Sequence, residues 1–524
     1  MQVALNNIES LKYFGPELVL VAAIILCLLW DLVVKERRIR LWGVLLIALA
    51  SLAYSAGVSV QVLSGTVTPL DLFGGTVVPP DASGATGLTA FDQFSNLFRA
   101  LFALVTAVTI VFIAPQALAP KPGGGHRNVS EMITLLVAIT LGLNLMAQAR
   151  HLLMIYLSLE MVSVLSFVLA GFKIRDRKSS EGALKYVIYG GVASGIMLYG
   201  MSWIYGLTGS LNLGEIWRHL AVLTAQQGRL PEAALVGVVC MLAGFGYKIS
   251  AAPFHMWTPD VYEGAPTPVT AFLSVGPKAA GFAVLIRFFA DALGAQGGLA
   301  LLGEAGAVEA PWVVIAGCLA MATMTVGNLS ALKQSNVKRM LAYSSIAHAG
   351  YMLLGFSVFS DAGIAAIAFY VFVYCFMNLG AFLVVMAVAE NTGGDESIGA
   401  FQGLGRRAPV LGALMAVFLF SLAGIPPLAG FAGKFYLFAA LIRAGGTWAW
   451  VLALVGVLNS VISLFYYARV LRAMYLDTAD AEEPIRVRWS FGATTVLLAI
   501  PVLVFGVYWA PLYDFVAGSL AMIR

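Results

Sequence analysis

Charged side chains are scarce in this chain of 524 residues, at 11% of the total, whereas a typical soluble domain carries about 25%. Hydrophobic residues make up 60%. A chain of this length could form several soluble domains, but this one lacks the charge to cover their surfaces. Intrinsic disorder is excluded as well, because disorder requires low hydrophobicity and high net charge. The composition therefore predicts a polytopic integral membrane protein.

Other absences narrow the functional classes. The net charge is only +4 and no basic arm interleaved with aromatics occurs, which argues against nucleic-acid binding. The four cysteines lie far apart in apolar stretches, and no pair has the C-x-x-C spacing of zinc or iron–sulfur sites. We interpret Cys27, Cys240, Cys318 and Cys375 as small core residues. No cleavable signal peptide is expected, because the first apolar segment lacks a small-residue cleavage site.

Long apolar runs are abundant. A membrane-spanning helix needs about 20 mostly apolar residues, and about fourteen segments meet this requirement. They lie near residues 15–34, 41–63, 92–114, 130–148, 151–172, 184–207, 233–253, 266–290, 311–331, 337–358, 362–389, 409–441, 449–474 and 490–513. The connections are short apart from 64–91 and 208–232, and residues 213–220 could form a surface helix. We therefore expect an all-α polytopic membrane protein without a sizeable soluble domain.

Lysine and arginine are distributed unevenly between the two ends of these segments. With the N-terminus outside, the inner ends and loops carry twenty of these residues and the outer ends carry eight. An excess of Lys and Arg marks the cytoplasmic side of a membrane protein, so the N-terminus is predicted to face outward. Three lysines belong to neither group.

Four charged residues are predicted inside the bilayer: Glu160, Lys248, Lys278 and Lys434. A charge at the bilayer centre costs about 2.5–3.5 kcal/mol on insertion scales, so such residues are functional candidates by default. The structural alternative for Glu160 is a buried carboxyl that ties helices together by hydrogen bonds, a role that glutamine would fill without the charge.

Prolines and glycines beside the three lysines predict weakened helices. Pro253 cannot donate a backbone hydrogen bond and clashes with the carbonyl of Ile249, next to Lys248. Pro277 and Gly276 stand beside Lys278, and two prolines with several glycines precede Lys434 within residues 423–435. Freed backbone at membrane depth is tolerated only where protein or water satisfies it.

The two strongest interruptions, near 248–253 and 424–434, point to an inverted repeat of the kind found in transporters. If helices 4–8 and 9–13 form the repeats, the interrupted helices are 7 and 12, the fourth member of each. A five-helix unit has an odd number of spans, so the second copy must be inverted in the membrane. We predict helices 1–3 within 1–129, the repeats over 130–290 and 311–474, and a C-terminal helix within 475–524.

Buried lysines beside a carboxylate suit proton transfer. Burial disfavours a charged ammonium, and a neighbouring carboxylate restores it, so moving or neutralising the carboxylate releases the proton. A Glu–Lys pair on adjacent helices is thus a proton switch. Sodium transport fits less well, because a sodium site needs several oxygen ligands and three of the four buried charges are cations.

Three further residues are candidates for the same path. His255 follows Pro253, and His348 lies mid-helix among polar residues. A lone buried histidine is often a hydrogen-bonding core residue, so both interpretations stay open for each. Lys185 opens the sixth segment, where it either extends toward the interface or takes a functional role.

A series of motifs resembles one family. It comprises Pro253-Phe-His-Met-Trp-Thr-Pro-Asp-Val-Tyr-Glu-Gly-Ala-Pro-Thr-Pro-Val269 with its continuation to Lys278, Ala183-Leu-Lys-Tyr with Tyr205–Leu211, Asn336–His348, and Gly424-Ile-Pro-Pro with Gly430-Phe-Ala-Gly-Lys434. These motifs are similar, in this order and over nearly the whole chain, to the antiporter-like subunits of respiratory complex I, the proton-translocating NADH-quinone oxidoreductase.

The resemblance implies fourteen helices, two inverted five-helix repeats, broken helices 7 and 12, and a proton relay through Glu160, Lys248, Lys278 and Lys434. Lys434 would gate exchange with the outer side. It also implies a non-redox subunit of a translocase in a bacterial-type inner membrane, with other membrane-arm subunits as partners. NADH, FMN, iron–sulfur clusters and quinone would belong to those partners, and this chain would hold no cofactor or metal.

Two other functions are kept open. One is an autonomous cation/proton antiporter subunit of the related multi-subunit type. The other is a structural scaffold whose buried charges only bind neighbouring helices.

Overall fold

The computed structural model of the chain describes residues 3–4, 7–65, 70–73, 87–118, 128–293, 311–478 and 484–520. In order, the elements are β1 (Val3–Ala4), α1 (Asn7–Ser10), α2 (Gly15–Val33), α3 (Arg37–Ser64), β2 (Leu70–Leu72), β3 (Thr89–Phe91), α4 (Gln93–Leu118), α5 (Val129–Gln148), α6 (Leu152–Ala170), α7 (Arg177–Thr208), α8 (Leu213–Gln227), α9 (Glu232–Ile249), α10 (Thr258–Gly264), α11 (Thr267–Leu293), α12 (Pro311–Ala331), α13 (Val337–Val358), α14 (Asp361–Asn391), the 3-10 helix η1 (Ile398–Phe401), α15 (Leu404–Arg407), α16 (Pro409–Ala423), α17 (Ala429–Ala444), α18 (Gly446–Tyr475), α19 (Trp489–Val507) and α20 (Ala510–Leu520).

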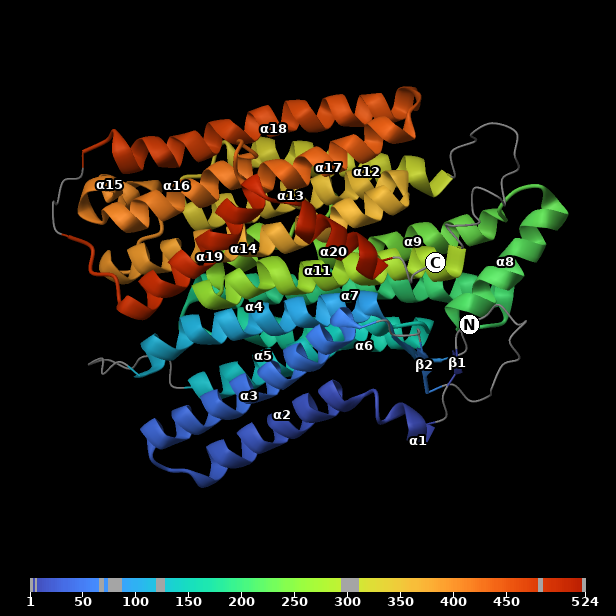
Figure 1. Cartoon of the computed structure of the whole chain (residues 1–524), viewed down its shortest axis with the longest axis horizontal. Helices are drawn as coiled ribbons and strands as arrows, with labels where there is room; N and C mark the ends of the chain where they lie inside the picture. Colours follow the sequence, from blue (N-terminus) through green and yellow to red (C-terminus); the bar gives the residue numbers. More distant parts are fainter. Residues whose placement is uncertain are drawn as a thin grey trace.

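The long helices lie side by side, with their axes along the longest axis of the molecule (Figure 1). α2 and α3 form one edge of the bundle and α18 the opposite edge, while α11 and α14 lie between them (Figure 1). α11 is buried along its whole length, whereas the edge helices expose apolar side chains such as Leu28, Leu46 and Val461. Exposed apolar faces on the outer helices are what a bundle surrounded by lipid presents.

The described part of the chain contains twelve helices that are long and apolar enough to cross a membrane. The other two predicted segments are α13 and the pair α16 and α17, which divide the segment at 409–441. The prediction of an all-α polytopic membrane protein is confirmed. The division of the chain into two five-helix repeats stays a prediction.

Both predicted helix breaks are present. α9 ends at Ile249, and Ser250 caps it in the left-handed region with φ 64° before α10 begins at Thr258. α16 ends at Ala423, and Gly424 has φ 88°, a conformation that glycine adopts without steric cost. α17 then begins at Ala429.

The structure differs from the sequence-based expectation at Pro277. We expected Pro277 and Gly276 to weaken the helix beside Lys278, but α11 continues through them. Neighbouring helices surround α11 on all sides, and such packing lets a spanning helix accommodate proline.

The end of the bundle that holds the N-terminus carries additional structure. α8 confirms the expected surface helix, and Asn212 caps its first turn by accepting from the amides of Gly214 and Glu215. β1, β2 and β3 form a small sheet in which β2 pairs with β1 in parallel and with β3 antiparallel. This sheet was not predicted, because its strands are only two or three residues long.

Candidate functional site

Glu160 and Lys248 are linked through a serine. Glu160 lies in the middle of α6, and its carboxylate accepts a hydrogen bond from the Ser194 hydroxyl of α7. One turn further along α6, Ser163 Oγ accepts a hydrogen bond of 3.0 Å from Lys248 Nζ. Among the described residues no ion pair joins Glu160 to Lys248, although their charges interact through space. The predicted Glu–Lys pair is therefore an indirect one.

Lys248 lies in the last turn of α9 and is 2% exposed. Its aliphatic stem packs against α11 at Gly281, where any side chain would collide with Ile249 and touch Lys248. Gly281 is one turn from Lys278 on the same helix. A glycine thus brings the first buried lysine against the helix that carries the second.

Lys278 extends from the centre of α11 to α13. Its ammonium donates hydrogen bonds to the backbone carbonyl and to the hydroxyl of Ser345. The same ammonium lies 6.0 Å from the centre of the Tyr374 ring of α14, within the range of a cation–π contact.

His348 lies one turn beyond Ser345 on α13. Its Nδ1 is 2.7 Å from the Tyr370 hydroxyl, and its Nε2 is 3.3 Å from the Tyr467 hydroxyl. The Tyr467 hydroxyl also shares a hydrogen bond with Ser344 Oγ. Both ring nitrogens therefore have partners, and the charges of Lys434 and Lys278 both act on the ring.

Lys434 lies on α17, and its side chain reaches back to the second helix break. Its Nζ donates to the carbonyl of Ala423 at 2.9 Å and to Ser460 Oγ at 2.9 Å. It also lies 4.5 Å from the centre of the Tyr351 ring. Ala423 is the last residue of α16, so the ammonium sits at the negative end of that helix, where a cation is stabilised.

We call five ionisable side chains the central row: Glu160, Lys248, Lys278, His348 and Lys434. The three lysines and His348 are buried, and Glu160 is partly buried. Hydroxyl groups lie at each of its lysines. Sequence reasoning did not find Ser163 and Ser345, although each stands three residues from a predicted residue on the same helix, at a spacing that places two side chains on one face.

Two sequence candidates lie outside the central row. Lys185 is 38% exposed and pairs with Glu181 at 2.8 Å and with Asp260 at 2.6 Å. His255 is buried in the segment between α9 and α10, and its Nδ1 has no hydrogen-bond partner among the described residues.

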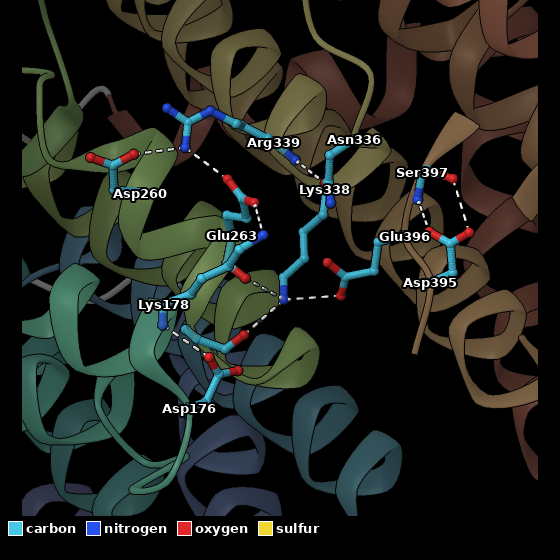
Figure 2. Close-up of polar contacts among 11 residues, drawn as sticks. Asp176, Lys178, Asp260, Glu263, Asn336, Lys338, Arg339, Asp395, Glu396 and Ser397 are labelled. Atoms are coloured by element: carbon cyan, nitrogen blue, oxygen red, sulfur yellow. Dashed lines mark hydrogen bonds and ion pairs between the residues drawn. The ribbon is translucent and has the colours of Figure 1, made fainter. Parts of the chain in front are cut away.

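Through Asp260, Lys185 belongs to a network of ion pairs at the end of the bundle that is rich in Lys and Arg. Figure 2 shows the part of this network around Asp260, Glu263 and Arg339. Arg339 of α13 binds both carboxylates of α10, Asp260 at 2.6 Å and Glu263 at 2.8 Å, and Lys178 of α7 binds Glu263 at 2.7 Å. Burial opposes ionisation of these two carboxyls, but the hydrogen bonds from their cations prevail and hold the pKa of each below its usual range. Both carboxylates are therefore ionised at neutral pH and join α7, α10 and α13.

Buried charges also occur where the sequence indicated only helix ends. Arg99 pairs with Glu17 at 2.9 Å, and Arg287 pairs with Asp92 at 2.9 Å, with both arginines fully buried. Lys338, counted with the inner-end cations, is fully buried as well. A position near a helix end does not reveal which neighbouring helix supplies the counter-ion, so sequence reasoning missed these pairs.

A helical bundle with two broken helices and a row of buried cations defines a polytopic membrane protein of the antiporter-like class. The family profile described as NADH:quinone oxidoreductase/Mrp antiporter, transmembrane, matches residues 149–463. The chain belongs to this family.

Two relatives and one solved structure cover almost the full length. The chain is 65% identical over 520 residues to NADH-quinone oxidoreductase subunit N 2 of Sorangium cellulosum (strain So ce56), covering 99% of each chain. It is 45% identical over 530 residues to subunit N of Anaeromyxobacter sp. (strain Fw109-5), covering 99% of this chain and 98% of the relative. A chain in the structure of respiratory complex I from Thermus thermophilus with bound aureothin is 29% identical, with a TM-score of 0.74 over 96% of this chain and 99% of that one.

Proposed function

We propose that this chain is a proton-translocating membrane-arm subunit of a complex I-type NADH-quinone oxidoreductase, and that the central row carries the protons. The observation that supports this most directly is that the three buried lysines lie in order across the bundle, each bound to a serine hydroxyl. Lys248 packs against Gly281, one turn from Lys278 on α11, and Lys278 binds Ser345, one turn from His348 on α13. Amines, a carboxylate, hydroxyls and an imidazole are all groups that accept and donate protons. A scaffold would be served equally well by neutral side chains, since buried ions are costly.

The groups of the central row act on one another's protonation through their charges. The charges of Glu160 and Lys248 interact through space, so a change in the position or protonation of Glu160 acts on the Lys248 amine. The charges of Lys278 and Lys434 both act on His348. Through His348, a change in the protonation of one lysine can therefore influence the other. Lys434, whose ammonium reaches the second helix break, is the group that we assign to exchange with the outer side.

The proposal assigns this chain a non-redox part in the enzyme. NADH, FMN, the iron–sulfur clusters and quinone are assigned to partner subunits, and other membrane-arm subunits are its direct neighbours. We place the chain in a bacterial-type inner membrane with its N-terminus on the outer side, on the strength of the uneven distribution of Lys and Arg.

Lys248→Met and Glu160→Ala in the assembled complex test the function. Each change removes a charge from the first half of the row. We expect each to lower the rate of proton pumping at least tenfold, since a positioned proton-transfer group contributes roughly a hundredfold or more to a rate. Pumping is measured in membrane vesicles with a pH-sensitive dye while NADH oxidation is followed in parallel. Lys333→Met, at an exposed lysine between α12 and α13, is the matched control.

Full pumping by both variants would contradict the proposal and favour the scaffold. Exchange of Na⁺ for H⁺ by the purified chain alone in liposomes would contradict it in another way, by favouring an autonomous antiporter.

A further inference from the structure

A pocket of about 420 Å³ lies at the end of the bundle that is rich in Lys and Arg. Its walls come from the start of α11, the end of α14 and the segment after α6, and they include Lys173, Thr267, Ala389, Glu390 and Glu396. Gly393 and Gly394, which also line it, are exposed, so the pocket reaches the surface. The central row, which lies deeper, does not account for it.

A fully buried lysine stands behind this pocket. Lys338 Nζ lies 3.1 Å from Glu396 Oε1 and also donates to the carbonyls of Ala265 at 2.7 Å and Glu263 at 3.3 Å (Figure 2). Glu396 is thus in contact with the pocket on one side and with a buried ammonium on the other, and its carboxylate also accepts from Thr267 Oγ1 at 3.2 Å. This pair connects the surface with the interior.

The other charges near Lys338 are already paired. The Glu263 carboxylate binds Arg339 and Lys178, and the neighbouring Arg339 binds Asp260 as well (Figure 2). Two further charged groups, Lys173 and Glu390, line the pocket itself. Glu396 is therefore the carboxylate available to exchange a proton with Lys338.

α13 leads from this pair to the central row. Ser345, which binds Lys278, lies two helical turns beyond Lys338, about 10 Å along the axis and on the same face. Tyr262 extends from Lys338 toward Ser345. Its backbone adjoins Glu263, whose carbonyl accepts from Lys338, and its hydroxyl lies beside Ser345. The hydroxyls of Tyr262 and Tyr374 are buried, and both lie beside Ser345. Clusters of buried polar groups are places where ordered water binds.

We propose that Glu396 and Lys338 form a proton-uptake site that supplies Lys278 from the pocket. This inference rests on the proposed function and extends it, since it identifies where protons enter. The neutral Lys278 amine takes a proton from the Ser345 hydroxyl, which regains one from a chain of waters that the proposal places along Tyr262. The Lys338 ammonium protonates the other end of that chain, Glu396 in its acid form reprotonates Lys338, and a hydronium ion in the pocket reprotonates Glu396. One proton moves inward and every other group is restored.

Variants at Glu396 and Lys338 in the assembled complex test this uptake site. We expect Glu396→Gln and Lys338→Met each to lower the initial rate of pumping by roughly tenfold. Glu396→Asp, which keeps an acid at the pocket wall, should retain most of the rate. Asp395→Asn is the matched control, because the adjacent Asp395 is exposed and binds Ser397 instead of Lys338 (Figure 2).

Closing the pocket provides a second measurement that is independent of Lys338. Ala389→Cys places a thiol in the pocket wall, and a membrane-impermeant thiol reagent added from the Lys- and Arg-rich side should slow pumping several-fold while leaving the parent complex unaffected. The same reagent added from the opposite side should have no effect.

Parent-like pumping by Glu396→Gln in a fully assembled complex would overturn the uptake site, and so would undiminished pumping by the labelled Ala389→Cys variant. If Lys248→Met is impaired in the same experiment, only the uptake site fails. If Lys248→Met also pumps normally, the proposed function fails instead. Should Lys338→Met not assemble, the comparison of Glu396→Gln with Glu396→Asp decides the matter.

Discussion

Lys278→Met should lower proton pumping by the assembled complex about a hundredfold. Lys278 is the group through which the Lys248 half of the central row meets Ser345 and, one turn further, His348. Without an amine there, a proton would have to pass the bilayer centre as an unpaired charge, at a cost of about 2.5–3.5 kcal/mol. A barrier higher by that amount corresponds to a rate lower by roughly two orders of magnitude.

The measurement separates transport from assembly. The amount of intact complex is determined by native gel electrophoresis, and pumping is measured per complex in vesicles. Methionine matches the four-atom apolar stem of lysine and lacks only the ammonium, so the packing of the stem is retained. Lys185→Met should leave pumping nearly unchanged, because Lys185 lies outside the central row and its half-exposed ion pairs contribute little. Equal pumping by Lys278→Met and the parent would exclude the relay through α11.

The parts of this site that could be predicted from sequence are those with a high energetic cost. A lysine within an apolar run is conspicuous, and Lys248, Lys278 and Lys434 all proved to be buried. The breaks after Ile249 and Ala423 were predictable for a similar reason, since proline removes a backbone donor at a depth where water does not replace it.

Contacts between helices could not be read in the same way. Ser163 and Ser345 look like ordinary helix serines until the fold places an ammonium beside each. Lys338 and Arg287 looked like charges at helix ends, because their counter-ions come from segments 58 and 195 residues away. The prediction at Pro277 was wrong for a related reason. The local sequence indicates a weak helix, but the surrounding helices keep α11 continuous.

Arg287→Met should prevent the chain from accumulating in the membrane. The Arg287 guanidinium is fully buried and binds Asp92 with two parallel contacts of 2.9 and 3.0 Å. Its Nε also donates to the carbonyl of Ala147 at 2.8 Å, so one side chain joins α11 to α5 and to the start of α4. Removing one member of a buried ion pair costs about 3–5 kcal/mol, because the other charge is left uncompensated. That loss is a large part of the net stability of a typical fold.

The double variant Arg287→Met/Asp92→Asn distinguishes this cause from a general loss of packing. Asparagine removes the orphaned charge but still accepts the hydrogen bond that the Ser95 amide donates to Asp92 at 2.7 Å. We therefore expect the double variant to accumulate better than Arg287→Met alone, a non-additive result that only a direct interaction produces. Abundance is measured by immunoblotting of membranes, and stability by heating the detergent-extracted complex. If the double variant is as poorly retained as the single one, the uncompensated charge is not the cause, and the packing of Arg287 against the Phe94 ring, 5.0 Å from its guanidinium carbon, becomes the explanation to test.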